Sequence, residues 1–251
     1  LGTGELRLVH APTGTGKTLA YLVPALLWAS RFGTRVGVAT YTRALQQQAM
    51  DREMPRALAA LASAGLAPPP RVSMLKGREN YLCWRALKLA VPDEDDDGES
   101  WLAWTSLALF ALRDAEGDVD RLPLRPPIPL DSSVAWRRRL DDLLRGVRSR
   151  NACCVGEADK RSCGAEIARR KAERSHLVIT NQAFALARPE FFKHVVFDEC
   201  EHLHDQALAA WSHVLTFRQM RATLARLHAP GRSGSVTALD RMQRAVLEGT
   251  P

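Results

Sequence analysis

Residues 11–18 read Ala-Pro-Thr-Gly-Thr-Gly-Lys-Thr, which is the composition and spacing of a loop that binds nucleotide phosphates. Its two glycines let the backbone curl, so that several N–H groups converge on one anion. The helix expected to begin near Gly16 directs its positive end to the same point. Lys17 is expected to reach the β- and γ-phosphates, and the Thr18 hydroxyl to hold Mg²⁺. The pattern therefore predicts a site for ATP and Mg²⁺, with these binding residues: Thr13, Gly14, Thr15, Gly16, Lys17 and Thr18.

An acidic pair far along the chain supplies the second half of such a site. Asp198 and Glu199 directly follow the apolar run at 194–197. In a nucleotide hydrolase, Asp198 would hold the Mg²⁺ coordination sphere and Glu199 would polarise the attacking water. An Asp-Glu pair after a strand is weak evidence alone, but it is strong evidence after a P-loop. Lys17, Asp198 and Glu199 are therefore the candidate catalytic residues.

The elements that must position these residues alternate between apolar strands and helices. Helices are expected after the phosphate loop and from a Thr42 cap onward. Strands are expected at residues 6–9, 35–40, 71–75, 177–182 and 194–197. This alternation predicts an α/β fold with a parallel sheet.

Composition limits the classes of protein to which the chain can belong. The 251 residues are enough for one sizeable core and an appended domain, and 46% are hydrophobic. The apolar run at 19–29 contains Pro24 and is too short to span a bilayer, so we expect no membrane partner. Without a signal-like start, the chain is expected to be a fragment of a cytoplasmic protein. Its net charge of +7 favours a polyanionic partner.

The composition changes in the middle of the chain. An acidic run at 93–97 predicts a solvated loop. Residues 136–174 carry a net charge of +6, as expected of a groove for a phosphate backbone, although a solvated basic helix would have the same charge. A helical face is predicted to pack in a core and comprises Trp101, Trp104, Leu107, Ala108 and Ala111.

Five motifs, in their order along the chain, resemble those of the XPD/DinG-type iron–sulfur DNA helicases of superfamily 2. They are Ala-Pro-Thr-Gly-Thr-Gly-Lys-Thr (11–18), Thr-Tyr-Thr-Arg-Ala-Leu-Gln (40–46), Lys-Gly-Arg-Glu-Asn-Tyr-Leu-Cys (76–83), Ile-Thr-Asn (179–181) and Val-Val-Phe-Asp-Glu-Cys (195–200). The resemblance covers nearly the whole chain. It implies a RecA-like motor domain interrupted by a mostly helical iron–sulfur-type insertion and followed by the start of a helical arch. The corresponding boundaries are 1–82, 83–163, 164–206 and 207–251.

The same resemblance implies ATP-dependent 5′→3′ translocation on single-stranded DNA and duplex unwinding. A hydroxyl and a guanidinium at the end of a strand are well placed to contact a phosphodiester backbone, although a capped, solvated helix start would look the same. The candidate nucleic-acid contacts are Thr42, Arg43, Arg78, Arg137, Arg138 and Arg139. A second motor domain and a segment that reads adenine are expected to lie outside this chain.

Two motor motifs depart from the family pattern. The family's Asp-Glu-Ala-His box reads Asp-Glu-Cys-Glu at 198–201, so Glu201 stands where the histidine would couple ATP to DNA. Gln182 replaces the histidine of the Thr-Asn-His pattern. Mg²⁺ and water handling are expected to survive these changes.

The cysteines are also irregular. Cys83 and Cys163 occupy the places of the first and last ligands of a [4Fe–4S] cluster, but Cys153 and Cys154 are adjacent. Neighbouring side chains of an extended backbone point in opposite directions, so Asp159 is an alternative ligand. The insertion is expected either to hold a [4Fe–4S] cluster or to be vestigial, and Cys200 is expected to be a plain buried thiol.

Two alternatives to a DinG/XPD-type helicase stay open at this point. One is a CRISPR-associated DinG-like helicase that works with an RNA-guided complex. The other is a non-catalytic module that binds ATP and nucleic acid.

Overall fold

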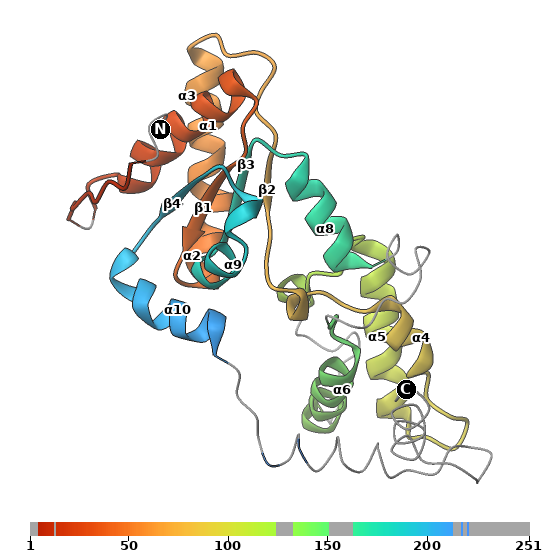
Figure 1. Cartoon of the computed structure of the whole chain (residues 1–251). Coiled ribbons are helices and arrows are strands. Elements are labelled where there is room, and N and C mark those ends of the chain that lie inside the picture. Colours follow the sequence, from red (N-terminus) through yellow and green to blue (C-terminus); the bar gives the residue numbers. More distant parts are fainter. Residues whose placement is uncertain are drawn as a thin grey trace, which may run out of the picture. The chain divides into compact units, whose positions relative to one another are not determined.

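The computed structural model describes residues 5–12, 14–123, 133–150 and 163–212, together with residues 217 and 220. The chain divides into two compact units, residues 1–210 and residues 211–251. Almost all of the described residues lie in the first unit, whose helices and strands are drawn in Figure 1.

A four-stranded parallel sheet forms the centre of the motor part, as predicted (Figure 1). Its strands are β1 (Val36–Thr40), β2 (Val72–Met74), β3 (Leu177–Asn181) and β4 (His194–Phe197). Their order is β2-β3-β1-β4, so β1 pairs with β3 on one side and with β4 on the other. Because all four strands run in the same direction, the acidic pair after β4 and Tyr41 and Thr42 after β1 emerge at the same edge.

The strand predicted at residues 6–9 is wrong. Residues 5–12 form neither helix nor strand, and Leu6, Leu8 and Val9 are largely exposed, Leu6 at 99%. A β-strand needs a neighbour for its backbone hydrogen bonds, and none of the four described strands pairs with this segment. An apolar run alone therefore did not determine the strand.

Helices pack on both faces of the sheet. After the phosphate loop comes α1 (Lys17–Phe32), and Thr42 caps α2 (Arg43–Gln48), which continues through a π-helical turn (Ala49–Glu53) into α3 (Met54–Ser63). These helices bury one face of the sheet. The opposite face is covered by α8 (Gly164–Glu173) and α9 (Gln182–Ala187). Alternate strand residues, such as Val38 and Ala39, therefore enter different cores.

The insertion has a helical core of its own. Its helices are α4 (Trp84–Leu89), α5 (Gly98–Arg113) and α6 (Ser133–Val147). The buried side chains at its centre include Leu87, Leu107, Trp136 and Leu140. Short 3₁₀ turns complete the described part: η2 (Arg78–Asn80), η3 (Val119–Arg121), η4 (Pro189–Phe191) and η5 (Cys200–His202), followed by α10 (Leu203–Trp211).

Two details of the insertion differ from the predictions. The core face of α5 is confirmed at Leu107, but Trp101 is 37% exposed and its indole N–H donates to the Asp93 carbonyl. The acidic run is mostly loop, yet Asp97 caps α5 by accepting from the Ser100 amide at 2.7 Å and also pairs with Arg139. Asp97 therefore stabilises a helix end, which an acidic run by itself does not indicate.

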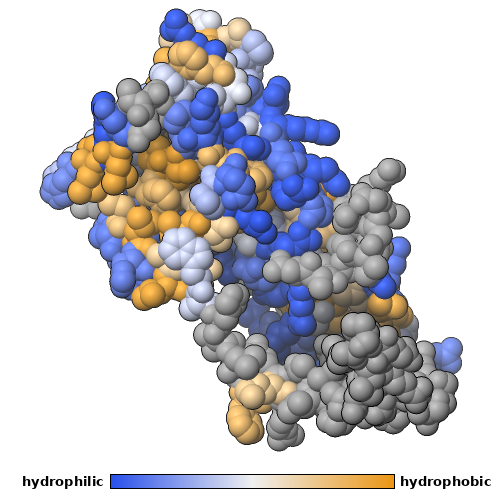
Figure 2. Space-filling view, viewed as in Figure 1, coloured by the Kyte–Doolittle hydropathy of each residue, from blue (hydrophilic) through white to orange (hydrophobic). Residues whose placement is uncertain are grey.

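The surface hydropathy differs between the helices of the motor part. Hydrophilic residues cover α8 and the neighbouring surface, whereas hydrophobic residues gather on the side where α1 and residues 5–12 lie (Figure 2). No helix among the described residues has both the length and the apolar character needed to cross a membrane.

Candidate active site

The phosphate loop has the backbone conformation that its glycines predict. Gly14 and Gly16 have φ angles of +81° and +78°, a left-handed conformation that residues with a Cβ seldom adopt. Gly16 is the N-cap of α1, so the helix begins at Lys17 and its free N–H groups face the loop. Thr15 donates its hydroxyl to the Pro12 carbonyl at 2.8 Å, and Thr13 lies outside the described residues.

Tyr21 joins the two halves of the site. Its hydroxyl donates to Asp198 Oδ2 at 3.0 Å and lies near the Thr18 side chain. Burial raises the pKa of Tyr21, and the charge of Asp198 raises it further, so the phenol stays protonated. The two predicted Mg²⁺ ligands, Thr18 and Asp198, are therefore brought together around one hydroxyl. Tyr21 was not singled out from the sequence, although it stands three residues after Thr18 on the same helical face.

Gln182 holds the backbone of the acidic pair. Its side-chain amide is fully buried and donates to the Asp198 carbonyl at 2.7 Å and to the Glu199 carbonyl at 3.1 Å. Glu199 has a φ of 53°, which is uncommon for a residue with a side chain. The glutamine that replaces the family's histidine thus donates to both carbonyls of this turn, and it fixes an unusual conformation directly at the predicted base.

The turn after the acidic pair contacts the end of β1. The His202 backbone amide donates to the Glu199 carbonyl at 3.2 Å. Its imidazole stacks on Tyr41, with ring centroids 4.0 Å apart and an interplanar angle of 19°. Glu201, which stands in the place of the family's histidine, is exposed. Neither Tyr41 nor His202 was singled out from the sequence, because the contact joins residues that are distant along the chain.

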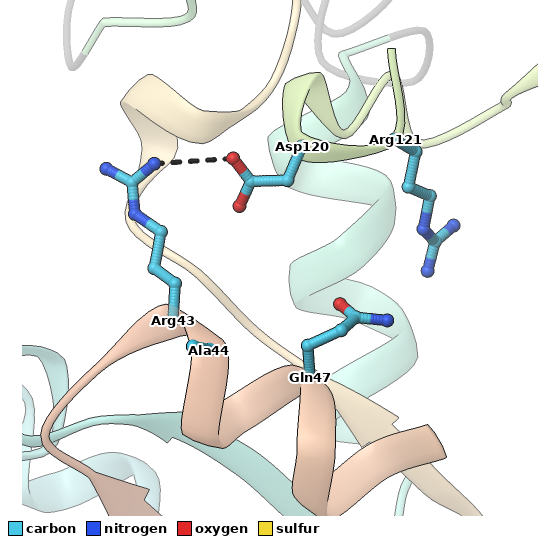
Figure 3. A pocket seen from close by; sticks show the side chains of 5 residues that line it. All are labelled: Arg43, Ala44, Gln47, Asp120 and Arg121. Carbon is cyan, nitrogen blue, oxygen red and sulfur yellow. Dashed lines mark hydrogen bonds and ion pairs between the residues drawn. The ribbon is translucent and has the colours of Figure 1, made fainter. Parts of the chain in front are cut away.

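The predicted nucleic-acid contacts after β1 lie beside an open cleft. Thr42 uses its hydroxyl oxygen to cap α2 by accepting from the Leu45 amide at 3.2 Å. Arg43 is exposed and pairs with Asp120 of the insertion at 3.3 Å (Figure 3). The cleft has a volume of about 390 Å³ and is lined by Arg43, Ala44, Gln47, Asp120 and Arg121.

A buried lysine connects the motor strand β2 to the insertion. Lys76 is 4% exposed, and its ammonium contacts Asp118 Oδ2 at 2.7 Å and Asp120 Oδ2 at 2.8 Å. Burial acts to raise the pKa of Asp120, but Lys76 and Arg43 outweigh this effect and lower it. Asp120 is therefore negatively charged and lies between two cations. Lys76 follows β2, and Arg43 follows β1.

Arg78, another predicted nucleic-acid contact, is engaged by side chains at the start of α8. It pairs with Glu166 of α8, and its Nη2 lies 3.9 Å from the Cys163 sulfur. Burial acts to raise the pKa of Glu166, but its contacts with Arg78 and Arg169 lower it. The other three arginines, Arg137 to Arg139, lie exposed on α6, where Arg139 pairs with Asp97.

Hydrogen bonds connect the segments on which the two described cysteines, Cys83 and Cys163, lie. Ser149 donates its hydroxyl to the Leu82 carbonyl and lies 3.8 Å from the Cys163 sulfur. The Cys83 amide donates to the Val147 carbonyl at 2.7 Å. Both thiols are buried, and each cysteine is the N-cap of a helix, α4 or α8. Cys153, Cys154 and Asp159 lie outside the described residues.

Cys200 is half-buried rather than fully buried. Within the part of the chain that the structure describes, no three His, Cys, Asp or Glu side chains are close enough together to hold a metal ion.

Comparison with known proteins agrees with this geometry. A family model described as DEAD/DEAH box helicase matches residues 2–64, which include the phosphate loop. The chain is 35% identical to the ATP-dependent helicase DinG of Mycobacterium tuberculosis over 85% of its own length. It is 30% identical to the ATP-dependent DNA helicase YoaA of Escherichia coli and 29% identical to the 3'-5' exonuclease DinG of Bacillus subtilis, over 86% and 89% of its length.

The chain spans about a third or less of the length of these curated relatives. The aligned part is 34% of the mycobacterial protein, 33% of YoaA and 23% of the Bacillus protein. The resemblance found in the five motifs is confirmed by these relatives.

Proposed function

We infer that this chain, a homologue of the DinG and YoaA helicases, supplies the nucleotide-binding part of an ATP-dependent DNA helicase. The observation that carries the proposal is the contact between the two halves of the site. Tyr21 of α1 touches Asp198 after β4, so the phosphate loop and the acidic pair face one site. A phosphate loop without this partner would support nucleotide binding alone.

Each residue of the site has a role that its position supports. The N-terminus of α1 and Lys17 bind the phosphates and stabilise negative charge that moves during transfer. Thr18 and Asp198 are hard oxygen ligands that suit Mg²⁺, which neutralises phosphate charge when it is bound. Glu199 orients and deprotonates the attacking water, while Gln182 holds the Glu199 backbone in place.

Single-stranded DNA is the proposed nucleic-acid partner. Arg43 opens onto the cleft at the carboxyl edge of the sheet, and Arg137 to Arg139 are exposed on α6. Arginines on a groove attract a phosphate backbone irrespective of base sequence. Thr42 contributes through the helix end that it caps, and Arg78 contributes by supporting the insertion. Translocation in the 5′→3′ direction and duplex unwinding stay predictions from the family resemblance.

The proposed domain division follows the sequence boundaries. Residues 1–82 and 164–206 form the first motor domain, residues 83–163 the insertion and residues 207–251 the start of an arch. In support, α4, α5 and α6 share a core that is separate from the two cores on the sheet.

The described residues of the insertion suit a [4Fe–4S] cluster. Iron–sulfur clusters are ligated by thiolates. Cys83 and Cys163 are buried thiols; Cys83 directly follows Leu82, whose carbonyl accepts from Ser149, and the Cys163 sulfur lies 3.8 Å from the Ser149 hydroxyl. Cys163 lies at the N-terminus of α8, and its sulfur is 3.9 Å from Arg78 Nη2. Cys83 and Cys163 would hold the cluster, and Cys153, Cys154 or Asp159 would complete its ligands. Tying these segments together would stabilise the insertion.

The nucleotide site is tested by Glu199→Gln and Lys17→Ala in the full-length protein. We expect Glu199→Gln to bind ATP normally and to hydrolyse it about 10²- to 10⁴-fold more slowly, because an amide is not a base. We expect Lys17→Ala to lose hydrolysis as well, since it removes the cation at the transferred phosphate. The measurements are nucleotide affinity and DNA-stimulated ATP hydrolysis.

Glu201→Gln is the matched control, because it makes the same change at an exposed carboxylate two residues further on. It should hydrolyse ATP at the wild-type rate. Normal hydrolysis by Glu199→Gln would contradict the assignment of the base. Wild-type protein that binds ATP and DNA without hydrolysing ATP would favour the non-catalytic module instead.

The cluster is tested by iron content and visible absorption after anaerobic purification. We expect Cys163→Ser to lose iron and colour and to lower the melting temperature, because the ligand and the constraint on the insertion are both removed. Cys200→Ser, on the motor strand, should keep both. A folded, DNA-binding wild-type protein without iron would rule out the cluster and leave the insertion as vestigial.

The alternative of a CRISPR-associated helicase stays a prediction. The names of the three relatives describe helicases and an exonuclease, and they do not refer to an RNA-guided complex.

A further inference from the structure

The histidine of the acidic box stands one residue later than in the family pattern. Residues 198–202 read Asp-Glu-Cys-Glu-His, and the last three form the 3₁₀ turn η5. A 3₁₀ helix has three residues per turn, so neighbouring side chains point about 120° apart. Accordingly, Glu201 is exposed and His202 is half-buried. The displacement turns the imidazole toward a different partner from the one that position 201 would face.

That partner is Tyr41, the first residue after β1. The two rings are stacked nearly parallel, with their centroids 4.0 Å apart. Tyr41 directly precedes Thr42, the cap of α2, and Arg43, which opens onto the cleft. Through this stack, a side chain of the acidic box rests on the segment that begins the proposed nucleic-acid contact.

The other end of His202 is tied to the ATP site. The Glu199 carbonyl accepts from the His202 amide at 3.2 Å and from the Gln182 side chain at 3.1 Å. The backbone of the proposed base and the imidazole are thus joined within a single turn. Any shift of the Glu199 backbone would therefore be transmitted to the ring that packs on Tyr41.

We propose that the Tyr41–His202 stack couples the ATP site to the nucleic-acid side of this protein, with His202 as the positioning residue. The inference rests on the proposed function, and it assigns the coupling to position 202 rather than 201. The imidazole contacts Tyr41 and not the reacting atoms, so its loss should affect communication more than chemistry. Because coupling between two binding sites is reciprocal, it should change both the effect of DNA on ATP and that of ATP on DNA.

The experiment measures ATP hydrolysis by the full-length protein with and without saturating single-stranded DNA. We expect His202→Ala and Tyr41→Ala to reduce the stimulation by DNA about fivefold or more, within the usual range of coupling between sites. The rate without DNA and the KM for ATP should stay at their wild-type values. In parallel, the change in DNA affinity caused by a non-hydrolysable ATP analogue should shrink by a similar factor.

Four further variants separate coupling from folding. Glu201→Ala should keep full stimulation, because its side chain is exposed. His202→Phe should also keep it, because the ring can still stack, whereas His202→Asn should lose it while keeping a polar side chain of similar reach. The double variant Tyr41→Ala/His202→Ala should be no worse than either single variant, as expected for one shared contact.

The proposal would be overturned if DNA stimulated ATP hydrolysis by His202→Ala and His202→Asn as strongly as in the wild type. It would also be overturned if Glu201→Ala lost this stimulation while the His202 variants kept it. Additive effects of the two alanine variants would also overturn it. A wild-type protein that hydrolyses no ATP would contradict the proposed function itself, which keeps the two failures apart.

Discussion

At the scale of single residues, the most informative contact is the one between Tyr21 and Asp198. Asp198 Oδ1 accepts from the Glu199 amide at 3.1 Å, and Oδ2 accepts from the Tyr21 hydroxyl at 3.0 Å. Both oxygens are thus oriented before any cation binds. A ligand that is held in place loses less conformational freedom on binding, so we propose that Tyr21 prepares Asp198 for Mg²⁺.

We expect Tyr21→Phe to weaken Mg²⁺-dependent ATP hydrolysis without unfolding the protein. The ring stays packed, and only the hydroxyl that orients Asp198 is removed. A hydrogen bond to a charged group contributes about 1.5–3 kcal/mol, which corresponds to roughly a tenfold or greater increase in the Mg²⁺ concentration required. The measurement is a Mg²⁺ titration of the hydrolysis rate, and an unchanged midpoint would exclude this role. Tyr81→Phe, which changes a buried phenol away from the acidic pair, is the control.

At the scale of elements, the first residue of α8 lies so close to the insertion that only a glycine, which has no side chain, fits there. A Cβ placed on Gly164, the first residue of α8, would overlap the Glu116 carbonyl oxygen. On the same helix, Lys171 pairs with Glu116 at 2.7 Å. The helix therefore attaches the motor sheet to the insertion through a contact that only glycine permits.

We expect Gly164→Ala to lower the free energy of unfolding by about 1–3 kcal/mol, because the added methyl group forces the helix and the Glu116 segment apart. Gly146→Ala is the matched control. Gly146 lies inside α6, and a Cβ there meets nothing within 4 Å. Because alanine is the better helix former, this control should be neutral or stabilising by about 0.5–1 kcal/mol. Thermal unfolding compares the two variants, and equal melting temperatures would contradict the close approach.

At the scale of the whole molecule, positive charge is concentrated in the second half of the insertion and in α8. Residues 136–174 hold a net charge of +6 out of +7 for the chain. Part of this charge is neutralised internally, since Arg139 pairs with Asp97 and Arg169 pairs with Glu166. The arginines exposed on α6 are the ones that we expect to meet a phosphate backbone.

We expect replacement of Arg137, Arg138 and Arg139 by glutamine to weaken binding of single-stranded DNA for all sequences alike. The slope of log affinity against log salt should flatten by roughly 0.7 for each phosphate that the variant no longer neutralises. Arg139 should contribute least, because it must leave Asp97 to reach DNA. The control is the same triple replacement at exposed motor arginines, namely Arg31, Arg52 and Arg56. Equal slopes for both triple variants would make α6 a merely solvated helix.

The sequence by itself determined the features that depend on neighbouring residues. The glycines of the phosphate loop, the Thr42 cap and the apolar strands that end in polar residues are local patterns, and the structure contains them. The signal is strong there because backbone conformation and capping are decided within a few residues.

Only the tertiary structure decided how these pieces meet. Tyr21 and Asp198 are 177 positions apart, and the stack of Tyr41 on His202 likewise depends on β1 and β4 being neighbours. The apolar run at 6–9 shows the converse, because without a described partner strand it forms no strand. Strand pairing and side-chain contacts depend on which segments come together in space, and local patterns carry no information about that.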